Sequence, residues 1–254
     1  MNTQVIFYPE EEREELCKFI EKKFGPDCRF ISHELDSEYV HTDVQLLTSE
    51  NGNREFVTSG MGARPMNSPT DFERTELVMS SSTVPDTTAS ESYLICNELR
   101  NLSKFPFRND TWFGPGHTIN VSEAFEERFG YPYVAFYDSG VYAEMEGVGE
   151  IGFLRAVPIY EDEYDWIVEN DTEVFLHLLH EKLGDAMFCV DCEREHVVPE
   201  HALDEDDKFL LNLMRTFHTD WETVQELAAY LEDVSERGEE ITRELVEAWL
   251  EQRE

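Results

Sequence analysis

The chain has 254 residues, 41% of them hydrophobic, and its 56 acidic and 20 basic side chains give a formal net charge of −36. This length and hydrophobic content predict a folded protein with a sizeable core and exclude a globally disordered chain. Because so negative a surface repels phosphate groups, binding to nucleic acid or to an anionic membrane is not expected, whereas a basic protein is a favourable partner.

The acidity has a second interpretation, a surface that is adapted to salt or is simply very soluble. No segment approaches the ~20 continuous apolar residues that a membrane-spanning helix needs. The chain starts without a signal peptide, and its five cysteines lie scattered at positions 17, 28, 96, 189 and 192. These features predict reduced thiols in a cytoplasmic protein rather than a disulfide framework.

The first predicted element is an amphipathic helix over residues 10–24, which ends at Gly25-Pro26. Residues 30–48 are strand-like, because positions 40, 42, 44 and 46 alternate with polar side chains. Asn51-Gly52 then predicts a hairpin turn. The N-terminal part is therefore expected to form a meander of antiparallel strands.

Residues 54–79 are predicted to form two strands joined by a long turn. Glycine reaches positive φ freely and proline fixes its own φ, so both residue types punctuate a chain. The turn contains Gly60, Gly62, Pro65 and Pro69. Met61 and Met66 are expected to anchor this turn in the core.

Residues 80–92 are polar and are predicted to be a surface connection. The segments that follow are predicted to be a helix over 91–104 that ends before Pro106, a short helix near 122–129, strands over 133–137 and 151–160, an acidic hairpin over 161–165, a helix over 172–183 capped by Asp171, and a last strand over 186–190. Strands and helices mixed in this way predict an α+β fold, with a mixed, largely antiparallel β-sheet flanked by helices.

The composition changes after Pro199, since residues 200–254 hold 17 acidic and 5 basic side chains. Three helices are predicted there, over 206–217, 220–235 and 239–252, and Thr219–Glu222 is a capping-box pattern. We therefore expect two domains, residues 1–199 and an acidic helical extension over residues 200–254.

Four segments of the chain, in this order, resemble the suppressor-of-fused domain family. They are YVHTDVQLL at 39–47, FVTSGMGARPM with RTELVM at 56–79, TWFGPGHTI at 111–119 and FLRAVPIYEDEYDWI at 153–167. The resemblance extends from about residue 30 to residue 195. One departure is visible, because three serines at 80–82 stand where the family's second signature strand runs into Leu-Pro.

The resemblance implies a non-enzymatic protein-binding domain, because suppressor-of-fused domains are binding modules. This chain looks like the stand-alone bacterial versions, which implies an immunity protein that binds a toxin domain and occludes its active site. The family motif assigns a structural or binding role to Thr58, Gly60, Met61, Pro65, Met66, Arg74, Glu76 and His117. A general adaptor or regulator that sequesters a partner protein is a further interpretation.

The catalytic alternative rests on a polar set, His41, Asp43, Arg74, Glu76 and His117. Imidazoles and carboxylates are suitable ligands for zinc or manganese, so His41, Asp43 and His117 define an alternative function, a metal-dependent hydrolase. The same set also fits a hydrogen-bonded strand pair in which Arg74 meets a carboxylate. Because no metalloenzyme spacing such as H-E-x-x-H occurs, we assign no catalytic residue, metal or cofactor.

Cys189 and Cys192, with His196 close by, make one half of a metal knuckle, but a second pair at suitable spacing is missing. The acidic hairpin is the more informative feature. Aromatic side chains among carboxylates favour a hot spot for a basic partner, with the alternative that the rings cover the core. The predicted partner-binding residues are Tyr160, Glu161, Asp162, Glu163, Tyr164 and Trp166.

Overall fold

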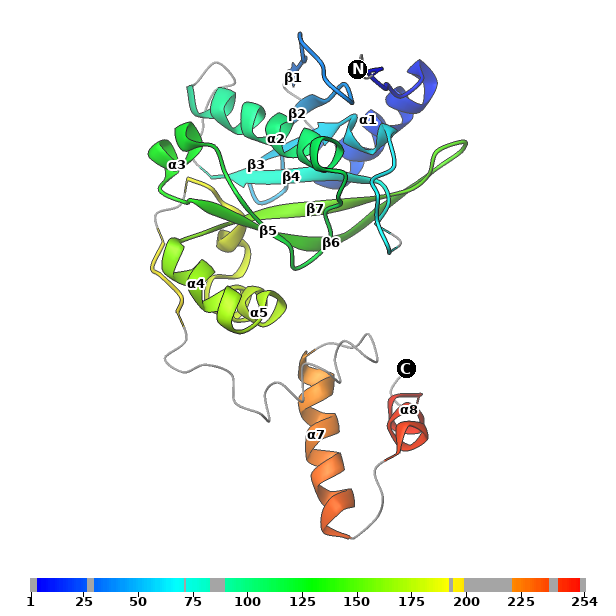
Figure 1. Cartoon of the computed structure of the whole chain (residues 1–254), viewed down its shortest axis with the longest axis vertical. Helices are drawn as coiled ribbons and strands as arrows, with labels where there is room; N and C mark the ends of the chain where they lie inside the picture. The colour runs from blue at the N-terminus through cyan, green and yellow to red at the C-terminus, as the bar shows by residue number, and fades with distance from the viewer. Residues whose placement is uncertain are drawn as a thin grey trace. The chain divides into compact units, whose positions relative to one another are not determined.

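A seven-stranded mixed sheet forms the centre of the first of two compact units, Met1–Val198 and Pro199–Glu254. The computed structural model describes residues 4–26, 30–70, 72–82, 90–191, 194–198, 221–237 and 242–251. The strands lie in the order β1-β2-β3-β4-β7-β6-β5 (Figure 1). They are β1 (Phe30–Ser32), β2 (Asp43–Thr48), β3 (Arg54–Ser59), β4 (Thr75–Ser81), β5 (Thr118–Asn120), β6 (Tyr133–Met145) and β7 (Gly149–Ile159).

Neighbouring strands pair antiparallel except β4 and β7, which pair parallel. The connection from β4 to β7 is long enough for this arrangement, because it contains α2, β5, α3 and β6. The helices of this unit are α1 (Glu10–Phe24), α2 (Ser90–Asn109), α3 (Glu123–Phe129), α4 (Glu161–Glu169) and α5 (Thr172–Leu183). The predicted α+β class, with a mixed and largely antiparallel sheet, is confirmed.

Helices cover both faces of the sheet. Successive strand residues point to opposite faces, so each strand contacts helices on both sides. Phe56 of β3 is buried in one apolar cluster with Leu99 of α2. The next residue, Val57, is buried in a second cluster with Ile20 of α1. Met61 and Met66 are both buried in the α2 cluster, so the predicted anchoring of the turn is confirmed. Burying one such side chain contributes roughly 1.5–3 kcal/mol.

The helix predicted over 91–104 is longer than expected, because Pro106 lies inside α2 and not beyond its end. Proline removes one helical hydrogen bond and usually stops a helix. Here Pro106 is buried four residues after the buried Leu102, so the same apolar stripe continues through it. We attribute the extra turn to this burial.

The strands predicted over 133–137 and 151–160 extend toward each other as the hairpin β6–β7. Gly147 lies in its turn and Gly149 begins β7, with φ of 82° and 96°. A bulge between Asp138 and Tyr142 interrupts the register without ending β6. Glycines therefore mark both the tight turn and the bulge, where Gly140 lies.

Two short strand predictions are wrong. The acidic segment at 161–165 is the start of α4, because the Glu163 carboxylate accepts a hydrogen bond from the Tyr160 backbone N–H at 2.9 Å and three acidic residues occupy the first turn. The segment at 186–190 lies largely in a 3₁₀ helix, Gly184–Phe188, and only Cys189 makes a bridge, to Ser80.

The serines that depart from the family pattern continue a strand. Ser80 and Ser81 belong to β4 and are buried, so the predicted surface connection starts after them. The Ser80 hydroxyl donates to Glu55 at 2.8 Å and accepts from Arg155 at 3.0 Å, which satisfies a polar side chain inside the sheet. Residues 83–89 lie outside the described residues.

The second unit contains α7 (Trp221–Glu236) and α8 (Arg243–Glu251), which confirms two of the three predicted helices. Leu227, Leu231 and Val246 are buried between them, and the rings of Tyr230 and Trp249 stack at 5.8 Å. The helix predicted over 206–217 and the cap at Thr219 lie outside the described residues. Among the described helices of both units, none has the length and apolar character needed to cross a bilayer.

Candidate functional site

Glu76 organises the turn between β3 and β4. Its side chain is fully buried, and its two carboxylate oxygens accept five hydrogen bonds. The Thr58 hydroxyl donates at 2.6 Å, the Tyr8 hydroxyl at 3.3 Å, and the backbone N–H groups of residues 60–62 at 2.9, 3.2 and 3.0 Å. The carboxylate therefore holds three chain segments together.

Glycine is required at two positions of this turn. Gly60 has φ of 141°, and a Cβ there would lie 1.9 Å from the carbonyl oxygen of His41. A Cβ on Gly62 would lie 2.5 Å from the hydroxyl of Tyr8. Both glycines let the backbone approach its neighbours closely enough for its N–H groups to converge on Glu76.

Burial raises the pKa of Glu76, and the hydrogen bonds from Thr58 and from the backbone oppose that shift because they favour the charged form. The pKa of Tyr8 is raised well above its usual value, first by burial and then by the charge of Glu76. Glu76 and Tyr8 are both buried, and their hydrogen bonds fix the turn in place.

Arg74 completes the turn, but it meets a carbonyl where the sequence predicts a carboxylate. Its Nη1 donates to the backbone oxygen of Gly62 at 2.7 Å. Met66 N–H donates to the carbonyl of Glu73 at 2.7 Å, and Pro65 beside it is exposed. Hydrogen bonds of Glu76, Arg74 and Met66 thus connect the turn to β4 and to the residues just before it.

His41 and Asp43 do lie together, at the start of β2. Asp43 Oδ1 lies 3.2 Å from His41 Nε2, and Oδ2 lies 2.9 Å from His33 Nδ1, a partner that the sequence did not indicate. The backbone N–H of Glu34 also donates to Oδ1 at 3.0 Å. The carboxylate is therefore surrounded by two imidazoles and one backbone N–H from residues 33–41.

The metal site of the hydrolase alternative, on His41, Asp43 and His117, is not formed. His117 directly precedes β5 at one edge of the sheet, and Asp43 begins β2, which is five strand spacings away. At ~4.8 Å per spacing this is roughly 24 Å, too far for one ion to bridge. Within the described part of the chain, no group of three or more His, Cys, Asp or Glu side chains has the arrangement of a metal site.

His117 instead packs its ring edge-on against Trp112, with centroids 4.3 Å apart. Burial lowers its pKa, opposed by a hydrogen bond with the Trp112 backbone. In the half-knuckle, Cys189 is buried and His196 pairs with Asp162, while Cys192 lies outside the described residues.

An ion pair between Glu163 and Arg194 organises the surface around α4. Arg194 Nη1 and Nη2 lie 2.5 and 2.7 Å from the two Glu163 oxygens, and both side chains are buried. Glu163 also accepts the backbone N–H of Val197 at 2.9 Å. This pair fixes residues 194–198 against the first turn of α4, and the sequence did not indicate it.

Tyr160 and His196 form an aromatic stack beside that ion pair. Their ring centroids lie 3.8 Å apart at 5°, and Asp162 lies 2.8 Å from His196 Nδ1. The Tyr160 hydroxyl donates to the carbonyl of Arg194 at 3.0 Å. Each ring of the stack therefore has a polar contact, and a carboxylate lies at its rim.

A groove of about 440 Å³ runs along this stack, between α4 on one side and α3 with the residues just before β6 on the other. Its walls carry one imidazole and four carboxylates, those of Glu126, Glu161, Asp162 and Asp165. The four acidic side chains are exposed, so their charge faces solvent and any molecule that enters. Charge of one sign in a concave surface favours a ligand of the opposite sign.

The predicted partner-binding residues divide into two groups. Tyr160, Glu161 and Asp162 line the groove. Glu163 and Trp166 are buried, and Tyr164 stacks on Tyr133 with centroids 3.8 Å apart, so these three support the surface without forming it. The helical structure explains the division, because a helix turns one side of this segment toward the core.

Comparison with known proteins identifies the same family that the sequence motifs resemble. The family model of the suppressor of fused protein matches residues 38–195. No curated protein sequence matches the chain. Solved structures with a similar fold include two that are each 10% identical in sequence to this chain.

One of these structures is described as the Sufu-Fu complex; its TM-score is 0.52, and the match covers 70% of this chain and 86% of that one. The other is Drosophila Suppressor of Fused, with a TM-score of 0.51; the match covers 72% of this chain and 50% of that one. This chain thus spans about half the length of the Drosophila protein.

Proposed function

Because the chain belongs to the suppressor of fused family, we propose that it is a non-enzymatic protein-binding module that acts as an immunity protein. In this proposal the folded domain binds a toxin domain and occludes its active site. The observation that carries the proposal is the acidic groove beside α4, where four exposed carboxylates flank the stack of Tyr160 on His196.

The partner that this groove suits is a basic protein surface. An aromatic stack supplies contact area at a small entropic cost, and carboxylates around it attract and orient lysine or arginine side chains. The net charge of −36 adds long-range attraction for a basic toxin, such as a nuclease, and imitates its anionic substrate. One solved relative in fold is a complex with a partner, the Sufu-Fu complex.

The interior supports a binding role over a catalytic one. The polar residues of the family turn are engaged in its structure, since Glu76 accepts five hydrogen bonds and Arg74 donates to a backbone carbonyl. The three residues of the hydrolase alternative lie at the start of β2 and beside β5, far apart in the sheet. We therefore infer no role in turnover for either group.

The test uses the product of the gene adjacent to the one that encodes this chain. We expect the two proteins to copurify and the chain to abolish the toxicity of that product in a growth assay. A variant with Glu126→Lys and Asp165→Lys is expected to lose both effects. Copurification with no effect on toxicity would indicate an adaptor or regulator and would refute the immunity role.

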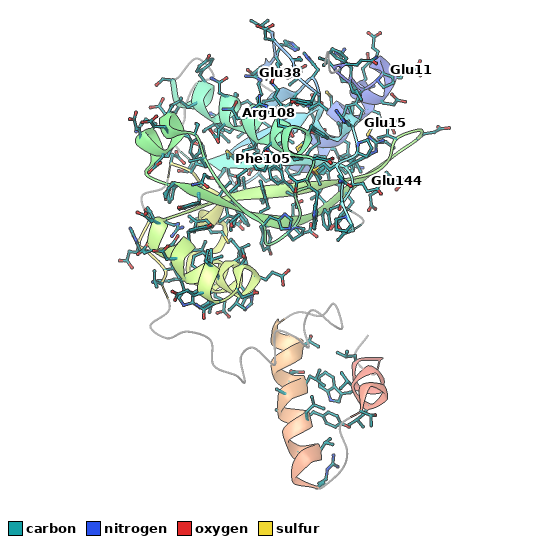
Figure 2. The ribbon with its side chains drawn as sticks, viewed as in Figure 1. Glu11, Glu15, Glu38, Phe105, Arg108 and Glu144 are labelled. Atoms are coloured by element: carbon teal, nitrogen blue, oxygen red, sulfur yellow. The ribbon has the colours of Figure 1, made fainter. Side chains whose placement is uncertain are left out.

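The matched control carries the same change of charge at a distance from the groove. Glu15 and Glu144 are exposed, and Figure 2 places them at the opposite end of the sheet from α4. The variant Glu15→Lys with Glu144→Lys should retain protection. If both variants lose protection equally, the groove is not the binding site and only the overall charge matters.

A further inference from the structure

A small pocket with aromatic walls lies beside the β6–β7 hairpin. Its volume is about 260 Å³, which is below the range of sites for drug-sized ligands but sufficient for one long side chain. The two rings that line it, Phe72 and Tyr142, are tilted at 52° with centroids 6.4 Å apart. Tyr142 is 39% exposed, so its ring is accessible from solvent.

Gly152 leaves space at the base of this pocket. It stands directly opposite Tyr142 in the register of the two strands and is a lining residue. A Cβ at Gly152 would lie 3.3 Å from the ring of Phe72 and 3.5 Å from that of Tyr142, so even a methyl group would contact both rings. The absence of a side chain therefore leaves that space to a ligand.

The polar groups around the Tyr142 ring are anionic. Glu150 lines the pocket and is exposed, and the Tyr142 hydroxyl donates to the carboxylate of Asp138. The pKa of Tyr142 is raised, first by burial, then by this hydrogen bond and by the negative charges of Asp138 and Glu150. The phenol therefore stays neutral, and the charge at the pocket is that of the carboxylates.

Elsewhere in the same fold, an aromatic ring and a carboxylate together hold an arginine. The guanidinium carbon of Arg194 lies 4.8 Å from the ring centroid of Tyr160, and this arginine pairs with Glu163. Arg155 lies 4.9 Å from a phenylalanine ring centroid and 3.1 Å from the carboxylate of Glu55. The pocket beside the hairpin offers the same two kinds of group, and among the described residues that line it there is no basic side chain.

We propose that this pocket binds the guanidinium group of an arginine side chain presented by another polypeptide. The planar cation stacks on the Tyr142 ring and pairs with Glu150, which a compact ammonium group does less well. Free arginine is a poorer ligand, because its own carboxylate would enter an anionic site whose described lining offers it no cation. The site is separate from the acidic groove and does not depend on the proposed function.

The experiment titrates the isotope-labelled full-length protein with a blocked peptide, acetyl-Gly-Arg-Gly-amide, and follows the backbone amides by NMR. We expect saturable shifts at Tyr142 and Gly152. The matching citrulline peptide, which is neutral and similar in shape, should bind at least about tenfold more weakly, and free L-arginine about threefold more weakly. Equal binding of the citrulline peptide, or shifts confined to the groove at Tyr160, would overturn the proposal. Equal binding of free arginine would indicate a small-molecule site and would refute a polypeptide ligand.

Two pairs of variants separate this site from general charge attraction. Glu150→Gln should weaken binding of the arginine peptide by about three- to tenfold. Glu146→Gln, an equal change on the exposed turn of the same hairpin, should weaken it by less than about twofold. Tyr142→Phe keeps the ring and should retain binding, whereas Tyr142→Leu should weaken it by at least about threefold. All four substitutions replace exposed side chains, so the fold is retained. Equal effects within either pair would refute recognition by the ring and the carboxylate.

Discussion

Arg194 and Glu163 form a bidentate ion pair whose side chains are 4% and 0% exposed. The guanidinium carbon also lies 4.8 Å from the ring centroid of Tyr160, and Nη2 donates to the carbonyl of Pro158 at 2.8 Å. One arginine therefore joins the segment 194–198 to the end of β7 and to α4. The shape of the acidic groove depends on this contact, because Tyr160 and His196 stack directly beside it.

Replacement of this arginine should be strongly destabilising. In Arg194→Met the Glu163 carboxylate remains buried without its cation, and we expect a loss of about 3–5 kcal/mol in the free energy of unfolding. Urea unfolding followed by circular dichroism measures it. The control is Arg108→Met, which removes a solvent-exposed ion pair with Glu38 (Figure 2) and should change stability by less than about 0.5 kcal/mol. Similar losses in both variants would contradict the assigned role.

The family turn should fail when its carboxylate becomes an amide. In Glu76→Gln the new NH₂ group faces backbone N–H donors at residues 60–62, so donors meet donors. We expect a loss of more than about 3 kcal/mol by the same urea assay, since hydrogen bonds to charged groups are the stronger ones. Glu73→Gln, on an exposed neighbour, is the control and should be nearly neutral. A stable Glu76→Gln protein would show that the turn does not need the charge.

The two glycines Gly60 and Gly130 should respond very differently to alanine. At Gly60 the added methyl group would lie 1.9 Å from a backbone oxygen that cannot move freely, so Gly60→Ala should leave little folded protein. At Gly130 the space is open and φ is 81°, so Gly130→Ala should cost only about 1–2 kcal/mol for the left-handed conformation. Thermal unfolding distinguishes them, and equal melting temperatures would argue against the close approach at Gly60.

Local sequence patterns predicted much of this fold. They failed where contacts between residues distant in sequence determine the structure. The helix start at Asp171 was predictable because its carboxylate accepts the N–H groups of Glu173 and Val174, which is a local cap. The start of α4 was missed because tyrosine is an unusual residue at that position, and acidic residues alternating with aromatic ones resemble a strand.

The candidate site was also only partly predictable from the sequence. The family signature identified Glu76 and its turn, but not which donors meet there, because Tyr8 lies 68 residues away in sequence. The pairing of Glu163 with Arg194 spans 31 residues and has no local pattern. The groove could be anticipated only as an acidic, aromatic segment, since its other wall comes from α3 and the residues just before β6.

His117 provides a pH test of its buried position. Its folded-state pKa is lowered below 6.5, mainly by burial, so the unfolded chain binds the proton more tightly. The stabilising contribution of the neutral ring is therefore present above pH 6.5 and is lost as pH falls through the folded-state pKa. NMR titration should place the His117 midpoint below 6.5, and Trp112→Ala should raise it by exposing the ring. A midpoint above 6.5 in the intact protein would contradict this assignment.

Association with the basic partner should depend steeply on salt. Ions screen charges beyond a Debye length, which is about 10 Å at 0.1 M and 3 Å at 1 M, so attraction by the acidic surface weakens as salt is added. We expect the association rate, measured by stopped flow, to fall at least about tenfold from 0.05 to 0.5 M sodium chloride. The dissociation rate should change much less, because steering acts on the encounter.

The Glu126→Lys and Asp165→Lys variant should flatten this salt dependence more than Glu15→Lys with Glu144→Lys does, since only the first pair removes charge from the groove. An association rate indifferent to salt would exclude electrostatic steering and leave shape complementarity at the Tyr160–His196 stack as the source of recognition.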